Sequence, residues 1–329
     1  MSQRINLSDM EKVPNKGTLL KYKRKSDKAI FSVKPIMIPN GSSPQAAQHP
    51  LVLHNEYMLK FPHNNLAKYY GYAERQESDY TEVLLFFEES EGILTDYLQD
   101  NKLNKEDVNS MVNGLIDVFM YIDRHAFALP SHISLNNILV IKTGFRSRCF
   151  KLFGTLPYDE DKNVNESDLK WVAPEVYEKY KLKRSHLYIN AEKAVFYSLG
   201  IVIIYAVLKD LITEGRDQIQ GDKFTGMNEV RENRAITDAK AKFASKVSDK
   251  ALLNIIEKLL VYSDKGRNDF RVWRLKNENS LLGVKAADQT HDFRSTNESK
   301  DSIAGGAQEL VIEGDEKNGA CCNSNCNIF

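Results

Sequence analysis

The cysteines carry the most distinctive chemistry that can be read from this sequence. Three of the four, Cys321, Cys322 and Cys326, lie within the last nine residues, while Cys149 stands alone in the body of the chain. No cysteine and histidine spacing matches a zinc site, so we expect no metal to be bound there. This arrangement is not a disulfide framework either, and it favours a reducing, cytosolic compartment in which the thiols are open to modification.

The last four residues, Cys326-Asn327-Ile328-Phe329, are similar to a prenylation signal, although Asn327 departs from the aliphatic pattern. The final phenylalanine favours a geranylgeranyl group. One lipid chain anchors weakly, so a second membrane signal is expected. It cannot be a basic patch, because residues 301–329 hold five acidic residues and one lysine. Cys321 and Cys322 are therefore the expected palmitoylation sites, and the chain is expected at the cytosolic face of a membrane.

Composition excludes several other classes of function. Lys and Arg number 45 and Asp and Glu number 45, with no basic segment, so nucleic acid is not an expected partner. The polar first residues do not form a signal peptide. The longest apolar run, residues 194–208, is shorter than the roughly 20 residues that cross a bilayer, and it is typical of a buried helix.

Hydrophobic periodicity changes from strand to helix along the chain. Residues 29–34 and 82–88 have strand patterns, whereas residues 108–122 form one face of a long helix that Asn104 and Asp107 would cap. A second apolar helix follows Ser248. We therefore predict an α+β fold of two lobes, with a small β-rich lobe over residues 1–88 and a larger helical lobe over 89–275. The polar, aperiodic residues 276–329 read as a flexible tail that carries the lipid anchor.

Several short motifs occur in a meaningful order. They are H-N-N-L-A-K-Y-Y-G at 63–71, L-L-F-F-E-E-S-E-G-I-L-T-D-Y-L at 84–98, N-N-I-L-V at 136–140, W-V-A-P-E at 171–175 and Y-S-L-G-I-V at 197–202. Together they resemble the eukaryotic protein kinase superfamily over roughly residues 10–275. This resemblance implies the two-lobed protein-kinase-like fold. It also implies a buried ion pair between Glu175, which closes the A-P-E motif, and Arg267.

The resemblance also implies positions for a nucleotide. Lys34 matches the strand lysine, Gly17 the third glycine of the phosphate loop, and Asn137 the metal-binding asparagine of the catalytic loop. Phe87 takes the gatekeeper position and Glu88 opens the hinge. Solvated Lys34 and an ordinary turn at Gly17 remain alternatives. The partner of Lys34 is also open, because the family spacing falls on His54 while Glu56 lies two residues later.

The residues that would move phosphate depart from the family pattern. His132 stands at the position of the catalytic aspartate, or Ser134 does in a second alignment. Leu152 replaces the D-F-G aspartate, and leucine cannot bind Mg²⁺. Val195 replaces the aspartate that braces the catalytic loop. The acidic residues 159–161 either substitute for the missing metal-binding aspartate or form a solvated surface cluster. His132 is either a proton acceptor or a structural residue.

These departures predict a catalytically impaired kinase, a pseudokinase, that acts as a membrane-tethered scaffold or allosteric regulator in signalling. Its expected partner is a protein, with an active kinase as one candidate. No metal or catalytic residue is expected, and no cofactor is certain apart from the covalent prenyl group. ATP binding without Mg²⁺-dependent transfer is one alternative. The other is a divergent active Ser/Thr or Tyr kinase that uses Lys34, Asn137 and a further carboxylate.

Overall fold

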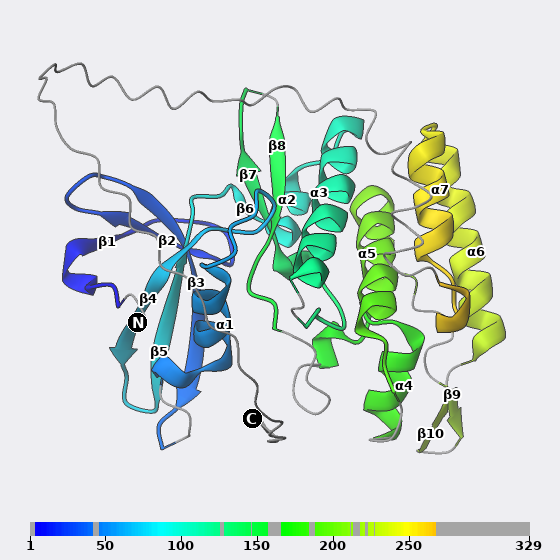
Figure 1. The fold of residues 1–329 in the computed structure, drawn as a ribbon, viewed down its shortest axis with the longest axis horizontal. Helices are drawn as coiled ribbons and strands as arrows, with labels where there is room; N and C mark the ends of the chain where they lie inside the picture. The colour runs from blue at the N-terminus through cyan, green and yellow to red at the C-terminus, as the bar shows by residue number, and fades with distance from the viewer. Residues whose placement is uncertain are drawn as a thin grey trace, which may run out of the picture. The chain divides into compact units, whose positions relative to one another are not determined.

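The structure is a computed structural model that describes residues 4–41, 46–125, 128–145, 147–156, 166–183, 188–210, 212, 218–220, 223–226 and 228–267 (Figure 1). The chain divides into one unit over Met1–Lys285 and another over Ala286–Phe329. All of the described residues belong to the first unit. The acidic residues 159–161 and the cysteines Cys321, Cys322 and Cys326 lie outside the described residues.

The N-terminal lobe is a five-stranded antiparallel sheet in the order β1-β2-β3-β5-β4. Its strands are β1 (Met10–Val13), β2 (Leu20–Arg24), β3 (Ile30–Pro39), β4 (Tyr69–Gln76) and β5 (Tyr80–Phe87), and the helix α1 (Pro50–Met58) lies against β4. The strands predicted over 29–34 and 82–88 are confirmed by β3 and β5. Successive side chains of β3 point to opposite faces of the sheet. Phe31 and Val33 pack into one buried apolar cluster. On the other face, Ser32 bonds to Ser90 in the connection to the second lobe, and Lys34 bonds to Gly154.

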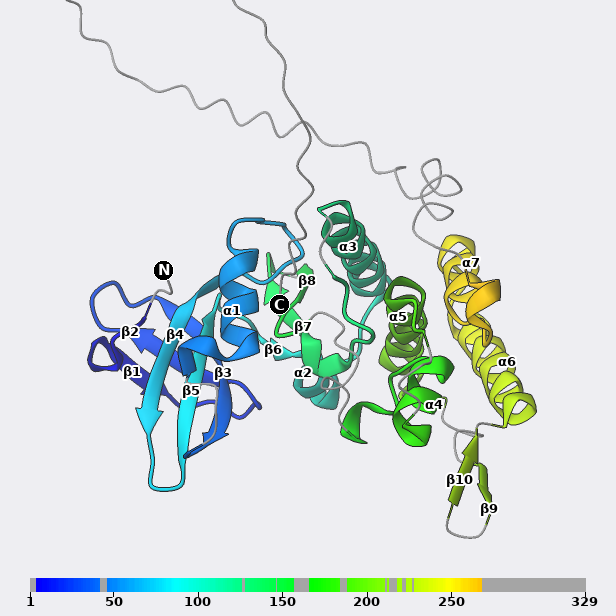
Figure 2. The ribbon, with the colours of Figure 1, turned by 60° about the horizontal axis from the view of Figure 1, so that its bottom comes forward.

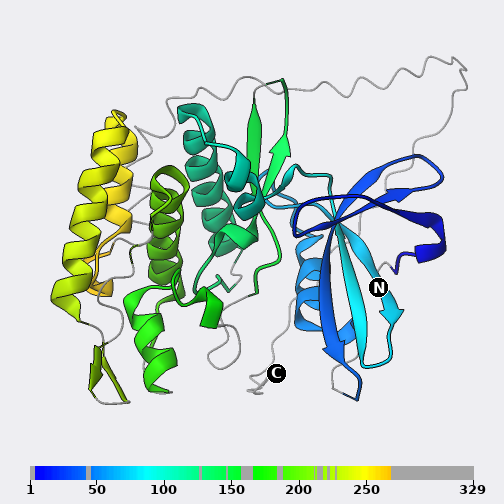
Figure 3. The same ribbon diagram turned by 180° about the vertical axis from the view of Figure 1, so that it is seen from behind.

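The second lobe is mainly helical, and the small sheet β6-β7-β8 lies between its helices and the first lobe (Figures 1 and 3). The strands are β6 (Gly92–Ile93), β7 (Ile138–Lys142) and β8 (Arg148–Leu152), and a separate hairpin joins β9 (Gln218–Gln220) to β10 (Lys223–Gly226) (Figure 2). The helices are α2 (Leu94–Asp100), α3 (Lys105–Arg124), α4 (Pro174–Leu182), α5 (Ala191–Leu208), α6 (Glu229–Lys246) and α7 (Lys250–Leu259). The predicted α+β arrangement in two lobes is therefore confirmed.

The caps of the two predicted helices can be compared with the structure. Asn104 Oδ1 accepts from Asp107 N at 2.7 Å, and Asp107 Oδ2 accepts from Asn104 N at 3.3 Å, so the predicted cap of α3 is a reciprocal capping box. The cap of α7 is Asp249, whose carboxylate accepts from the backbone N–H groups of Ala251 and Leu252. Asp249 can accept two bonds with one carboxylate, which favours it as the cap.

The helix α5 forms the centre of the helical lobe. By length and composition it is the one helix in the described part of the chain that could cross a membrane. Its residues from Ala194 to Ile204 are buried, however, in the same cluster as the apolar face of α3. It therefore acts as a core helix of this lobe, as its 15-residue apolar run predicted.

Candidate functional site

A cavity of about 430 Å³ lies between the lobes and brings together four residues singled out from the sequence, Lys34, His132, Ser134 and Asn137. Lys34 reaches it from β3, while His132 and Asn137 reach it from the loop and short 3₁₀ helix (Leu135–Asn137) that precede β7. Asp168, from a second 3₁₀ helix (Glu166–Asp168), also lines it. This cavity is the candidate functional site.

Lys34 is partly buried and points at the turn after β8. Its Nζ donates to Gly154 O at 3.3 Å and lies 5.3 Å from the centre of the Phe153 ring. Among the described residues no carboxylate oxygen lies within 4 Å of this ammonium. Burial lowers the pKa of Lys34, and the charge of Asp168 opposes that shift. Gly154 has φ +59°, a backbone conformation that favours glycine, and a Cβ there would lie 2.7 Å from Lys34 Nζ, so a larger residue would displace the end of the lysine side chain.

The helix α1 supplies no partner for Lys34 in the described structure. One oxygen of the Glu56 carboxylate is buried without a hydrogen bond, and so is the Tyr69 hydroxyl. Burial, with a further contribution from the charge of Glu56, raises the pKa of Tyr69. His54 lines a different cavity, of about 590 Å³, where burial lowers its pKa. Neither of the two positions considered from the sequence therefore holds the lysine.

The imidazole of His132 faces a carboxylate from another segment. Its Nδ1 lies 3.2 Å from Ser131 Oγ, and its Nε2 lies 3.8 Å from Asp168 Oδ2. Asp168 was not predicted as a site residue, and it lies seven residues before Glu175 in a short acidic turn. Its proximity to His132, 36 residues earlier, could not be read from local patterns.

Asn137 uses its side chain to hold its own loop. Its Oδ1 accepts from both the backbone N and the Oγ of Ser134, each at 3.0 Å. The oxygen that would bind a metal is therefore already engaged. No group of three or more His, Cys, Asp or Glu side chains suited to a metal ion occurs in the described part of the chain.

Leu152 lies at the end of β8 and is fully buried in the core of the helical lobe. Its backbone N–H donates to Asn65 O at 2.8 Å and its carbonyl accepts from Ala67 N at 2.9 Å. The next residue, Phe153, packs edge to face on Phe87 with 5.4 Å between ring centres. The position that holds a metal-binding aspartate in the resembled family is here part of an apolar core.

The remaining nucleotide positions lie away from Lys34. Phe87 is buried against Phe153 and Tyr69. The Glu88 carboxylate accepts two bonds from Lys151 Nζ, both 2.9 Å, and lines the larger cavity. Neither side chain borders the cavity of Lys34, so the structure does not unite these five predicted nucleotide positions in one site.

Gly17 lies where the turn between β1 and β2 touches α2. The next residue, Thr18, donates from its backbone N to Asp96 Oδ2 at 2.6 Å and from its Oγ1 to Asp96 Oδ1 at 2.8 Å. A Cβ on Gly17 would lie 2.8 Å from Asp96 Oδ2. This glycine therefore permits the turn to bind α2 closely.

The catalytic loop is held to α5 by a residue other than the one at the position of the family's bracing aspartate. Val195 is indeed buried in the apolar core. Three residues later, however, Ser198 Oγ donates to Ile133 O at 2.7 Å and accepts from Ile133 N at 2.9 Å. One buried hydroxyl thus pairs both backbone groups of Ile133 and holds the loop to α5.

Ser198→Ala is expected to lower the free energy of unfolding by about 1–3 kcal/mol, because it leaves a buried donor and acceptor unpaired. Urea unfolding of purified protein measures this change. Ser245→Ala removes an exposed hydroxyl on α6 and should change stability by less than about 0.5 kcal/mol. Equal effects of the two substitutions would contradict the bracing role.

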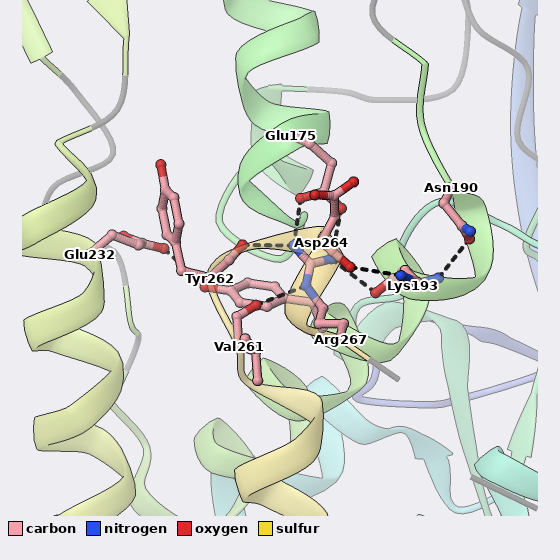
Figure 4. A network of polar contacts seen from close by, with 9 residues as sticks. Glu175, Asn190, Lys193, Glu232, Val261, Tyr262, Asp264 and Arg267 are labelled. Atoms are coloured by element: carbon pink, nitrogen blue, oxygen red, sulfur yellow. Dashed lines mark hydrogen bonds and ion pairs between the residues drawn. The ribbon is translucent and has the colours of Figure 1, made fainter. Parts of the chain in front are cut away.

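The ion pair between Glu175 and Arg267 is present and bidentate (Figure 4). Arg267 Nη1 and Nη2 donate to the two Glu175 oxygens at 2.7 and 2.6 Å. The other three N–H groups of the guanidinium reach the carbonyls of Val261, Tyr262 and Lys193. All five donors are therefore used by a side chain that is only 1% exposed. The pair joins the start of α4 to the segment after α7.

Comparison with known proteins agrees with this geometry. A family model described as the protein kinase domain matches residues 15–272, which is well over half of the chain. The chain therefore belongs to the protein kinase family, and its two lobes are those of a protein kinase domain. No curated protein matches it closely enough to count as a relative.

Proposed function

We propose that this member of the protein kinase family is a pseudokinase, which transfers no phosphate and acts by binding a protein partner. The observation that carries the proposal is the packing at the two aspartate positions. His132 is ordered beside Ser131 and Asp168, and Leu152 is buried in the core. Both side chains are therefore held by contacts within the domain, and neither offers the carboxylate that phosphoryl transfer uses at its position.

Phosphoryl transfer depends on positioning and on neutralising charge, mostly through Mg²⁺ held by an aspartate and an asparagine. Leucine offers no ligand at position 152, and the Asn137 oxygen is engaged by Ser134. Lys34 has no carboxylate within 4 Å among the described residues, so it is not held in place by an ion pair. These features all argue against an efficient transfer step.

The contacts that hold the domain together are present. Glu175 with Arg267, and Ser198 with Ile133, pin the segment before α4 and the catalytic loop to the helical lobe. A rigid domain without the chemistry suits a scaffold or allosteric regulator. An active kinase is the partner class that we propose first.

We further propose that a prenyl group on Cys326, supported by palmitoylation of Cys321 or Cys322, tethers the protein to the cytosolic face of a membrane. The support is the sequence of the last nine residues and their lack of basic charge. Cys326→Ser is expected to move most of the protein from the membrane fraction of expressing cells to the soluble fraction. Cys149→Ser, which changes a partly buried thiol on β8, is the control and should leave the distribution unchanged. Unchanged membrane association of Cys326→Ser would contradict the anchor.

The rival function is that of a divergent active kinase, and Asp168 is the observation that favours it, because this carboxylate lines the same cavity as Lys34 and His132. Mg²⁺-dependent autophosphorylation of the purified protein separates the two. We expect no transfer above a reaction without protein. Robust transfer that disappears in Lys34→Ala would overturn the pseudokinase proposal.

A further inference from the structure

Five polar groups of Lys21, Ser32 and Ser90 form a closed network where the first lobe joins the second. Lys21 Nζ donates to Ser32 Oγ at 2.8 Å and to the backbone carbonyl of Ser90. Ser90 N donates to Ser32 Oγ at 3.0 Å, and the two serine hydroxyls share a hydrogen bond of 2.8 Å. Ser32 is 0% exposed and Ser90 is 7% exposed, so most of this network is sealed from water.

The register of the sheet places this network beside the connector between the lobes. Lys21 pairs with Ser32 across β2 and β3, and Ser32 pairs with Phe87 across β3 and β5. Lys21, Ser32 and Phe87 therefore form one row across three strands. Phe87 is the last residue of β5, and residues 88–91 after it form the connector between the lobes. Lys21 and Ser32 therefore project over this connector from the roof of the cleft.

The backbone of the connector is largely committed to partners within the chain. Glu88 N donates to Lys68 O at 3.0 Å, Glu91 N donates to Val140 O at 2.7 Å, and Ser90 N donates to Ser32 Oγ. At Ser90 both the N–H and the carbonyl are paired with side chains of the sheet. The cavity of Lys34 stops short of this point, because it is bordered by Leu19 and Ile93 and not by Lys21, Ser32 or Ser90.

A purine is recognised through the donors and acceptors on its edge, which need free complementary groups on the protein. To reach the connector, a purine would have to break the bonds to Ser90 and displace an ammonium. Burial already lowers the pKa of Lys21, which is offset in part by the nearby charge of Glu89. Leaving a buried donor or acceptor unpaired costs about 1–3 kcal/mol for each group.

We propose that Lys21 and Ser32 occupy the place that a nucleobase would take against Ser90, so that the cleft excludes purine nucleosides. This inference rests on the pseudokinase assignment and extends it, because a domain that excludes the base would neither bind ATP nor transfer its phosphate. Phosphate groups are not involved, because the network lies away from Lys34 and Asn137.

The test is calorimetric titration with adenosine, which carries the base without the phosphates. The wild-type protein should give no saturable binding at millimolar adenosine. The double variant Lys21→Leu/Ser32→Ala frees both groups of Ser90, and it should bind at least about tenfold more tightly. Lys23→Leu, which changes the next lysine on the same face of β2, is the matched control and should behave as wild type.

Two results would overturn the proposal. One is wild-type binding of adenosine as tight as that of the double variant. The other is a folded double variant, with a cooperative thermal transition, that still does not bind. If the double variant does not fold, Lys21→Ala alone is titrated with adenosine. A folded Lys21→Ala protein that binds no more tightly than the wild type would then overturn the proposal. A wild-type protein that binds adenosine but transfers no phosphate defeats this inference alone, whereas phosphate transfer by the wild type defeats the pseudokinase assignment.

Discussion

Arg267→Met is expected to lower the free energy of unfolding by about 3–5 kcal/mol, because it leaves the Glu175 carboxylate without its buried partner. The substitution also removes the donors to three backbone carbonyls after α7 and on α5. Chemical denaturation with two-state analysis gives the change. A loss of this size would also reduce the amount of folded protein in cells.

The control for this prediction is Arg234→Met, which changes an arginine on α6 that is 84% exposed and forms a long ion pair with Asp238, at 3.9 Å. It should alter stability by less than about 0.5 kcal/mol. The double variant Arg267→Met/Glu175→Met should be less destabilised than the sum of the single variants, because no charge is left unpaired. A loss below about 1 kcal/mol for Arg267→Met would show that the pair does not hold the segment.

Leu152→Asp, which restores the aspartate of the D-F-G motif, is expected to destabilise the protein by at least about 3 kcal/mol. The leucine side chain is fully buried in the core of the helical lobe, so the change removes packing and places a carboxylate among apolar groups. Urea unfolding measures the loss. We expect no gain of Mg²⁺-dependent transfer, because His132 still occupies the other aspartate position.

Leu152→Met keeps an apolar side chain of similar volume at the same site, and it should cost less than about 1.5 kcal/mol. A Leu152→Asp variant as stable as Leu152→Met would mean that this position tolerates a carboxylate. The apolar core would then not explain the absence of the aspartate.

Much of the fold could be predicted because it depends on local patterns. The strand over 82–88 contains the continuous apolar run 83–87, and the helix α3 begins with a cap whose residues are three apart. The ion pair of Glu175 and Arg267 could be predicted only through the family resemblance, since 92 residues separate its partners.

The unpredicted features are contacts between segments that are distant in sequence. Ser198 braces Ile133 across 65 residues, and Ser32 meets Ser90 across 58 residues. Serines are common and hydrophobic periodicity does not mark them, so no local signal identifies these hydroxyls. Asp168 was missed for the same reason. Its carboxylate lies 3.8 Å from His132 Nε2, although 36 residues separate the two in sequence.

We propose that this kinase domain keeps the fold without phosphoryl transfer, and Asp168 is the carboxylate that could support transfer instead, because it lines the cavity of Lys34 and His132. The most direct measurement is the rate of γ-phosphate transfer from Mg²⁺·ATP to the protein itself and to a generic protein substrate. It compares the wild type with Asp168→Asn. We predict that neither protein transfers phosphate above a reaction without protein. Transfer by the wild type that falls at least about tenfold in Asp168→Asn would contradict the account and establish an active kinase with a relocated carboxylate.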